Sequence, residues 1–431
     1  MRFIMKILIL FLLTINAHGK SIKDYAYYKY DLSFTNPICS EYSYDQAMIS
    51  NNGNELASKP KNVYCKKGDK SFNENRSDNP HGLLKALISS PDLKSIFLTF
   101  LSFSNSDIAK SLCHAISRGV EVTFIIDSNN EDRDYGREEL DFIANCAPPA
   151  GGKKAVTLFR GNRGGLGYAH NKIIMADYKE NNDKTTIVFS SGNMSSGTTL
   201  HHENWHFLTT SKESYFYQAH DCVRQGMLDE NISSRRAKFK KFLKGCRDNI
   251  SVKEEDDIKT YFVPSDGKIA MDNILMNMKK ASSVDIAVHR FTHPDLINGL
   301  VAKKDAVRFI SDDDLYWTGI KRGTVGSNMI FEYYNLEKIQ KSGAKIKFME
   351  TNEGARLLHH NKFIIFNYED QSRAVHTGAG NFTKAAFSKN FENYYFITIP
   401  EITQKFARQY HFMFDIQASS TQEMPNEYVL P

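Results

Sequence analysis

Long apolar runs are nearly absent from this chain of 431 residues. The only one, ILILFLLTI, lies within the first 19 residues and is shorter than the roughly 20 residues that span a bilayer. Arg2 and Lys6 flank its start and the small-residue end Ala17-His18-Gly19 follows it, which is the pattern of a secretory signal peptide. No cysteine follows before Cys39, which argues against a lipid anchor. We therefore expect a signal peptide at 1–19 and an exported protein, periplasmic or extracellular.

Several motif classes are also missing. The chain has no Cys-x-x-Cys pair, so a structural zinc site has little support. The Gly-rich stretch GNRGGLGYAH lacks Gly-Lys-Ser/Thr and is not a nucleotide-binding loop. We expect it to form a flexible rim at a pocket entrance; contact with a substrate phosphate is the alternative. A strong excess of one charge is missing too, since the net charge is +5. That value permits a phosphate-bearing partner, although a solvated basic surface explains it more simply.

The six cysteines gain a meaning from the expected export. An even number of cysteines in an oxidising compartment favours disulfides. Sequence order suggests the pairs Cys39–Cys65, Cys113–Cys146 and Cys222–Cys246, which is one of 15 possible pairings.

The rest of the chain is organised as two similar halves. Apolar, β-branched runs such as IFLTFLSF and VEVTFIID alternate with helical patterns, and the alternation occurs twice, which indicates an α/β fold with layered sheets. We expect an irregular N-terminal extension at 20–75, a first domain at 76–250, a second domain at 251–420 and a C-terminal tail at 421–431. The Lys-rich segment 214–263 is interpreted as helices and a linker between the halves.

One polar motif is present in both halves. His170-Asn171-Lys172 is followed by Asp177, by Gly192-Asn193 with Ser195, and by Glu203-Asn204. The second copy contains His360-Asn361-Lys362, Asn367, Gly380-Asn381 with Thr383, and Glu392-Asn393. Histidine and asparagine are 23 residues apart in one copy and 21 in the other, although the surrounding residues differ. The matched spacing indicates a duplicated domain.

Strand geometry explains the spacing. Residues i and i+2 of a strand point to the same side, so each histidine points the same way as its lysine. The next strand runs back and brings Asn193 or Asn381 to the same end of the sheet. Two halves docked about a pseudo-twofold axis would therefore assemble two histidines, two lysines and two asparagines around one pocket.

Such a pocket suits a phosphodiester. Lys172 and Lys362 supply positive charge, and the two asparagines donate hydrogen bonds to the phosphoryl oxygens. One imidazole attacks phosphorus while the other protonates the leaving oxygen. Glu203 and Glu392 are expected to hold the opposite ring nitrogen of each histidine. Because the lysines supply the charge, we expect no metal and no cofactor.

The doubled His-x-Lys-x4-Asp motif, followed by a strand that ends in Gly-Asn, resembles the phospholipase D superfamily. The resemblance extends from about Ser77 to Gln417. It implies two pseudo-symmetric α/β sandwich domains that share one central active site, a covalent phosphohistidine intermediate and metal independence. By the same resemblance, His170 is the nucleophile and His360 the acid. Asn367 departs from the family pattern, because it stands where Asp is usual and where the first copy has Asp177.

Three functions remain open at this stage. The leading hypothesis is a secreted phospholipase D that hydrolyses phospholipid head groups or transfers them to an alcohol, with peripheral membrane contact and no obligate protein partner. The alternative is a secreted nuclease, since GNFTKAAFSKNFEN looks like the bacterial endonuclease branch of the superfamily. The third is a catalytically silent binder of lipid or nucleic acid, supported only by Asn367.

Two further stretches have an ordinary and a functional interpretation. His202 and His206 have the i,i+4 spacing of helical metal ligands, although the second copy of the motif keeps only Glu-Asn there. Asp312-Asp313-Asp314 suggests magnesium, but we expect a solvated loop. Tyr316 and Trp317 beside it are expected to line the substrate entrance or to pack.

Overall fold

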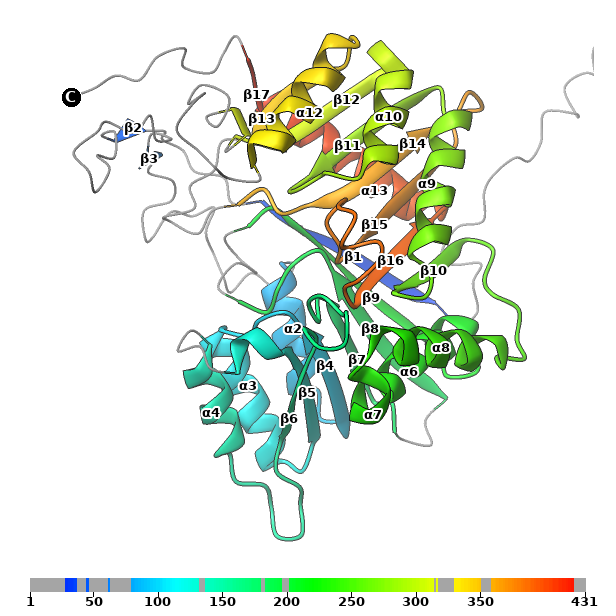
Figure 1. Ribbon diagram of the computed structural model, residues 1–431. Helices are drawn as coiled ribbons and strands as arrows, with labels where there is room; N and C mark the ends of the chain where they lie inside the picture. Colours follow the sequence, from blue (N-terminus) through cyan, green and yellow to red (C-terminus); the bar gives the residue numbers. More distant parts are fainter. Residues whose placement is uncertain are drawn as a thin grey trace, which may run out of the picture.

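The computed structural model describes residues 28–36, 44–45, 61–62, 79–131, 136–179, 183–195, 201–313, 315–316, 329–349 and 358–421. Figure 1 shows two α/β units, each a sheet with helices on it, which meet through the strands that carry the repeated motif. The predicted Cys39–Cys65 pair, together with Asp314 and Trp317, lies outside the described residues.

The first sheet has seven strands in the order β1-β9-β8-β7-β4-β5-β6. Its strands are β1 (Lys29–Thr35), β4 (Ser95–Phe100), β5 (Glu121–Asp127), β6 (Val156–Arg160), β7 (Ile173–Ala176), β8 (Lys184–Ser190) and β9 (Glu203–Ser211). Strands β4, β5 and β6 are parallel, and the remaining neighbours are antiparallel.

The second sheet has eight strands in the order β10-β16-β15-β14-β11-β12-β13-β17. They are β10 (Ile258–Val263), β11 (Ser283–Val288), β12 (Val307–Asp312), β13 (Lys345–Met349), β14 (Lys362–Asn367), β15 (Arg373–Gly378), β16 (Glu392–Ile397) and β17 (Ser419–Ser420). Apart from β17, its order repeats that of the first sheet strand for strand, which confirms the predicted pseudo-symmetric architecture. A separate small ladder pairs β2 (Tyr44–Asp45) with β3 (Lys61–Asn62).

Helices cover both sheets (Figure 1). They are α2 (Pro80–Ser89), α3 (Ser106–Ser117), α4 (Arg137–Ala144), α6 (Tyr215–Leu228), α7 (Glu230–Ser233), α8 (Arg236–Asp248), α9 (Gly267–Lys280), α10 (Pro294–Lys303), α12 (Met329–Lys341) and α13 (Pro400–Phe412), with short turns η3 (Ser128–Asn130), η4 (Lys304–Ala306) and η6 (Met413–Gln417). Local sequence explains their boundaries; α3, for example, begins where the Asn105 side chain accepts a hydrogen bond from Ile108 N–H at 3.0 Å. None of the described helices is long and apolar enough to cross a membrane.

A central core joins the two units. Phe189 of the first sheet stacks on Tyr395 of the second, with ring centroids 3.8 Å apart. Phe406 of α13 lies 5.2 Å from Phe34 and 5.0 Å from Phe363, so it contacts both halves. Each unit also has an apolar cluster of its own, between its sheet and its outer helices. The halves are therefore packed together through shared apolar side chains.

Two predicted disulfides are confirmed, and two predicted segment assignments are wrong. The disulfides Cys113–Cys146 and Cys222–Cys246 form as predicted. The expected irregular extension is wrong for Lys29–Thr35, which pairs with β9 as the edge strand of the first sheet. The expected linker is wrong for Ile258–Val263, which pairs with β16. Both segments are edge strands, and the conformation of an edge strand depends strongly on its packing against the neighbouring strand.

Candidate active site

The two copies of the motif meet where the sheets face each other. His170 and Lys172 come directly before β7, whereas Lys362 opens β14 two residues after His360. The alternation of strand side chains directs both histidine–lysine pairs to the ends of the strands at the interface. Both lysines are fully buried, and each histidine has 8% of its surface exposed. The positive groups therefore line an almost closed site.

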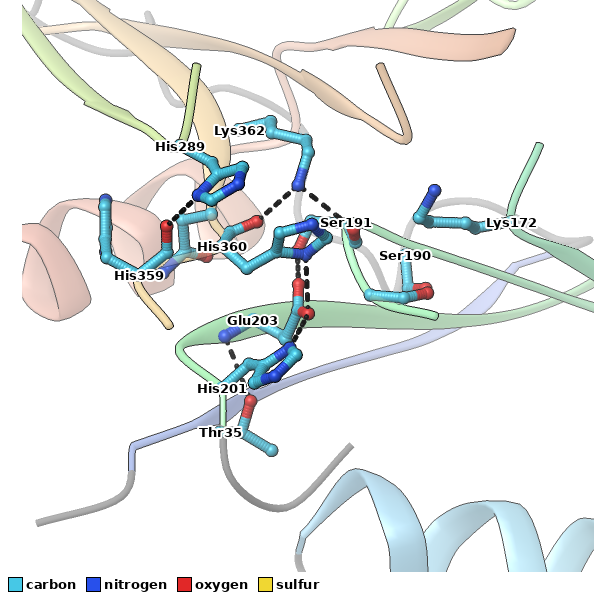
Figure 2. A network of polar contacts seen from close by, with 12 residues as sticks. Thr35, Lys172, Ser190, Ser191, His201, Glu203, His289, His359, His360 and Lys362 are labelled. Carbon is cyan, nitrogen blue, oxygen red and sulfur yellow. Dashed lines mark hydrogen bonds and ion pairs between the residues drawn. The ribbon is translucent and has the colours of Figure 1, made fainter. Parts of the chain in front are cut away.

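The supporting carboxylates are exchanged between the halves. Nδ1 of His170 lies 2.8 Å from Oε2 of Glu392, and Nδ1 of His360 lies 2.7 Å from Oε1 of Glu203 (Figure 2 shows the second pair). A carboxylate only accepts hydrogen bonds, so Nδ1 donates in each pair and Nε2 is left to face a substrate. The expected contact of each glutamate with a histidine ring is present, and it crosses from one half to the other.

Backbone contacts fix the two histidines. His170 N–H donates to Phe391 O at 2.9 Å, and His360 N–H donates to His202 O at 3.1 Å, so each histidine is bonded to the other half. The preceding residues are held by aspartates at the ends of equivalent strands. Asp127 accepts from Ala169 N–H at 2.6 Å and Asp312 accepts from His359 N–H at 3.0 Å.

The role of Asp312 corrects an expectation. Asp312 and Asp313 are fully buried, so they do not belong to a solvated loop. The pairing of Asp127 with Asp312 could have been found in the sequence, since both end corresponding strands, VEVTFIID and VRFISD. Tyr316 is buried and its ring packs against Phe348, which favours the packing interpretation over lining the entrance.

Each lysine lies close to the histidine two residues before it. Lys172 Nζ lies 3.2 Å from Nε2 of His170 and donates to His170 O at 3.0 Å. Lys362 Nζ donates to His360 O at 2.7 Å and to Ser191 O at 3.4 Å. Burial lowers the pKa of Lys172 to about 8, against the attraction of Glu392 and Glu203. Burial also holds the pKa of Lys362 well below its ordinary value. A bound phosphate would favour the charged form of both.

Burial and the charges of both halves shift the pKa values of the histidines, the lysines and Glu203. Burial lowers the pKa of His170, and the charges of Lys172 and Lys362 act in the same direction against Glu392. Burial likewise lowers the pKa of His360 far below its ordinary value. Burial alone would raise the pKa of Glu203, but His360, His201 and Lys362 hold it well below the usual range. Lysines and carboxylates of both halves thus act on one another.

Asn193 and Asn381 lie at equivalent places, after β8 and β15. The side-chain oxygen of each is buried and accepts no hydrogen bond. Ser195 N–H donates to Asn193 O and Thr383 N–H donates to Asn381 O, both at 2.9 Å, so the serine and threonine close matching turns behind the asparagines. The turns leave both asparagine amides available to a ligand.

Asp177 and Asn367 lie away from this site, at the other end of their strands. Asn367 is five residues beyond Lys362 on β14, about 16 Å away along the strand. Its amide donates to Ser283 Oγ at 3.2 Å and to Asp285 Oδ2 at 3.0 Å. Asp177 accepts from Lys94 N–H at 2.8 Å. Both residues tie strands together, and in the second half a neighbouring Asp285 carries the negative charge.

Two asparagines were missed as part of the site by sequence reasoning. Asn393 accepts from Lys172 N–H at 2.9 Å, and Asn204 donates to Asn361 Oδ1 at 3.0 Å, both across the interface. Their signal was present in the repeated Glu-Asn pair, which places a buried amide next to each carboxylate.

The structure does not support the less favoured interpretation of His202 and His206 as helical metal ligands. His206 belongs to strand β9, where residues i and i+4 are about 13 Å apart, and its ring contacts Tyr30 and Asn204. Among the described residues, the group with metal-ligand geometry is His201, Glu203 and His360, whose ligand atoms lie within 4.8 Å of one another.

The Gly-rich loop, expected to form a rim at the pocket entrance, makes hydrogen bonds to the second half. Gly167 N–H donates across the interface to Lys389 O at 3.1 Å, and Asn162 N–H donates to Gly167 O at 2.8 Å. Gly161 has φ +90°, and a Cβ there would lie 2.6 Å from Ala169 N. The loop therefore fixes the approach to His170.

The sequence was compared with known proteins and solved structures. The family model described as cardiolipin synthase, PLD-like domain, matches residues 84–220 and 274–413, well over half of the chain. No curated protein matches the sequence.

Among solved structures, phosphatidylserine synthase from Haemophilus influenzae Rd KW20 is 13% identical with a TM-score of 0.58, over 80% of this chain and 86% of that one. The phospholipase D family member Nuc from Salmonella typhimurium is 25% identical with a TM-score of 0.29, over 38% of this chain and 96% of that one. Polyphosphate kinase from Porphyromonas gingivalis is 13% identical with a TM-score of 0.47 over 81% of this chain, which spans only 51% of that protein. The family match covers both halves and their paired motifs, and this chain therefore belongs to the phospholipase D superfamily.

Proposed function

We propose that this chain is a metal-independent phosphodiesterase that acts through a phosphohistidine at His170. Nε2 of His170 attacks phosphorus while the bond to the leaving oxygen breaks, and His360 donates a proton to that oxygen. Water then attacks phosphorus, His360 takes a proton from it, and the bond between phosphorus and His170 breaks. Lys172, Lys362, Asn193 and Asn381 hold the phosphoryl oxygens throughout.

The observation that carries this proposal is the exchange of carboxylates. Each histidine has its Nδ1 fixed by a glutamate of the other half, at 2.8 and 2.7 Å, so both Nε2 atoms are held ready within one site. A silent binder has no need of two oriented imidazoles. Its only support, Asn367, lies away from the site and has its own structural partners.

For the substrate we propose a phospholipid, hydrolysed between phosphate and head group, with peripheral contact to a membrane and no obligate protein partner. Support comes from the family model, whose description names a cardiolipin synthase and which matches both halves. We also propose that the chain is exported. The N-terminal pattern and the two disulfides, which persist in oxidising compartments, support this.

A second candidate, a nuclease, is favoured by one observation. Six exposed cations lie on α8 and at the residue before it, and they form no ion pair within the described part of the chain: Arg235, Arg236, Lys238, Lys240, Lys241 and Lys244. Arg236 N–H donates to Gly164 O at 3.3 Å, in the loop that leads to His170. A basic surface beside the site suits a longer polyanion.

The test offers the purified protein, in EDTA, phosphatidylcholine vesicles and a single-stranded oligonucleotide in parallel. His170→Ala and His360→Ala are the matched controls, and each should abolish turnover. Release of choline that is lost in both variants supports the phospholipase; cleavage of the oligonucleotide alone supports the nuclease. Full activity in either variant would refute a shared site.

The intermediate has its own test. Rapid quenching in alkaline denaturant with phosphorus-labelled substrate should leave label on the protein, bound through a phosphoramidate that is stable in base and is lost on acid treatment. His360→Ala should accumulate less label if it is the acid of the first step, and His170→Ala should show none. Label retained in His170→Ala would reverse the proposed roles.

A further inference from the structure

The two supporting glutamates have different polar neighbours. Glu203 and Glu392 each have a polar neighbour two positions earlier: His201 in the first half and Asn390 in the second. Asn390 Nδ2 donates to Glu392 Oε1 at 2.8 Å, whereas His201 Nδ1 lies 3.3 Å from Glu203 Oε1. The duplicated positions do the same structural work, but only His201 adds a metal-ligating nitrogen.

His201 completes a three-ligand cluster. Figure 2 shows His201 and His360 on either side of Glu203, and their ring centroids are 5.6 Å apart. Two imidazole nitrogens and one carboxylate, with a fourth position left to water, form a ligand set that binds zinc in proteins. Ligand atoms on tetrahedral zinc are about 3.3 Å apart. The separation of 3.3 Å between His201 Nδ1 and Glu203 Oε1 already has that value, and the separation of 2.7 Å between His360 Nδ1 and Glu203 Oε1 must widen slightly. All three ligand atoms lie within 4.8 Å of one another.

The three side chains of the cluster are nearly buried, and neighbouring residues hold the carboxylate in place. The side chains of His201 and His360 expose 13% and 10% of their surface, and that of Glu203 exposes none. Ser191 Oγ donates to the other oxygen of Glu203 at 2.6 Å, and Glu203 N–H donates to Thr35 Oγ1 at 3.0 Å. Outer contacts of this kind orient metal ligands. Lys362 adds a positive charge close by, which weakens the binding of a cation without removing a ligand.

We propose that His201, Glu203 and His360 form an inhibitory zinc site. Zn²⁺ takes the lone pair of the His360 nitrogen that faces Glu203, and the proton held there leaves to solvent. The ring then keeps at most one proton, on Nε2, and a neutral metal-bound imidazole is a much weaker acid than an imidazolium. His360 therefore no longer protonates the leaving oxygen, and turnover stops. The inhibition rests on the proposed function; the binding of zinc does not.

The second half provides the matched variant. His201→Asn installs the residue that the chain itself uses beside Glu392, so the hydrogen bond to the carboxylate is kept while one ligand is lost. Asn390→His is the converse change and should create a second cluster around Glu392 and His170. Circular dichroism and thermal unfolding of both variants, compared with wild type, establish that each is folded.

Binding is measured with Zn²⁺ by titration calorimetry and with Co²⁺ by its visible absorption, on the metal-free full chain. Wild type should bind one ion with a tetrahedral cobalt spectrum. His201→Asn should bind at least tenfold more weakly and lose that spectrum, and Asn390→His should bind two ions. Failure of wild type to bind, or equal binding by folded His201→Asn, would overturn the site.

Inhibition is measured separately, with each variant's rate expressed relative to its own rate in EDTA. Zinc should inhibit wild type, and at least tenfold more zinc should be needed for His201→Asn. Binding without inhibition in an active enzyme overturns the inhibitory role alone. If no phosphodiester is hydrolysed by the wild type, the proposed function fails while the binding experiment still decides whether the site exists.

Discussion

Two buried lysines dominate the site at the scale of single residues. The lysine ammonium groups are buried where they could bind the phosphate of a substrate, but they stay buried when no substrate is present. Burial lowers the pKa of Lys172 from 10.5 to about 8, so the charged form costs folding free energy at neutral pH. Activity and stability therefore make opposite demands on the same residue.

Lys172→Met tests this conflict. The variant should be inactive. At pH 7 it should be about 1–3 kcal/mol more stable than wild type, because methionine has a similar volume to lysine but carries no charge that must be buried. Between the folded pKa near 8 and the unfolded value of 10.5, the unfolded wild type binds more protons than the folded one. Wild type thus gains stability as the pH rises through this window, and the advantage of the variant shrinks. Urea unfolding at pH 7 and pH 10 measures both values; a variant less stable at pH 7 would contradict the prediction.

Asn367→Asp tests the departure from the family motif. The new carboxylate would lie beside Asp285, whose Oδ2 is 3.0 Å from the Asn367 amide, and it would lose the donor to Ser283. We expect a loss of about 1–2 kcal/mol in unfolding free energy, moderated by Arg373. The turnover number should change less than twofold because the residue lies far from His360. A large gain in activity would mean that Asn367 weakens catalysis after all.

At the scale of elements, the short loop between β6 and His170 links the fold to the chemistry. Gly161 lies against Asp127 and against Ala169, the residue that precedes the proposed nucleophile His170. The backbone of Gly161 has φ +90°. The loop also reaches the second half through Lys389. Its conformation therefore sets where His170 stands relative to Glu392.

Gly161→Ala and Gly165→Ala form a matched pair. Both glycines have positive φ, so alanine costs about 1–2 kcal/mol at either position. A Cβ at Gly161 would meet Ala169 N at 2.6 Å and Asp127 Oδ2 at 2.7 Å, whereas nothing lies within 4 Å at Gly165. We expect Gly161→Ala to lose at least tenfold in turnover and Gly165→Ala to keep it. Steady-state kinetics with thermal unfolding decides; equal kinetics in the two variants would show that the loop does not position His170.

At the scale of the whole molecule, the two halves share one core. Helix α13 places Phe406 against Phe34, His206 and Phe363, which belong to both sheets. Residues from the two units form one apolar cluster between them. The halves should therefore unfold together.

Phe406→Ala examines that coupling. Removing a fully buried phenylalanine should lower the unfolding free energy by about 3–5 kcal/mol and shift a single calorimetric transition to lower temperature. Ile269→Ala, at a position with 58% of its surface exposed on α9, is the control and should change stability by less than about 0.5 kcal/mol. Two separate transitions in wild type would contradict a shared core.

Some of these features could be predicted from sequence because they depend on neighbouring residues or on the repeat. Others depend on contacts between the two halves and could not be predicted. The central strand β5 is a continuous apolar run, and the run VEVTFIID predicted its limits within one residue. The duplication identified the histidines, lysines, asparagines and glutamates because two copies could be compared. The exchange of carboxylates was not predictable, since a sequence does not show which half a side chain faces. The position of His201 beside His360 was not predictable either, for the same reason.

The exchanged glutamates also have a consequence for the history of the chain. A single unlinked unit would hold a histidine and a lysine but no carboxylate for its own histidine. It could act only beside a second copy, and in a pair of identical subunits every substitution appears on both sides of the symmetry axis. Fusion into one polypeptide secures the partner at high effective concentration and ends that constraint. One half can then keep Asn390 while the other carries His201, a difference that two identical subunits could not have.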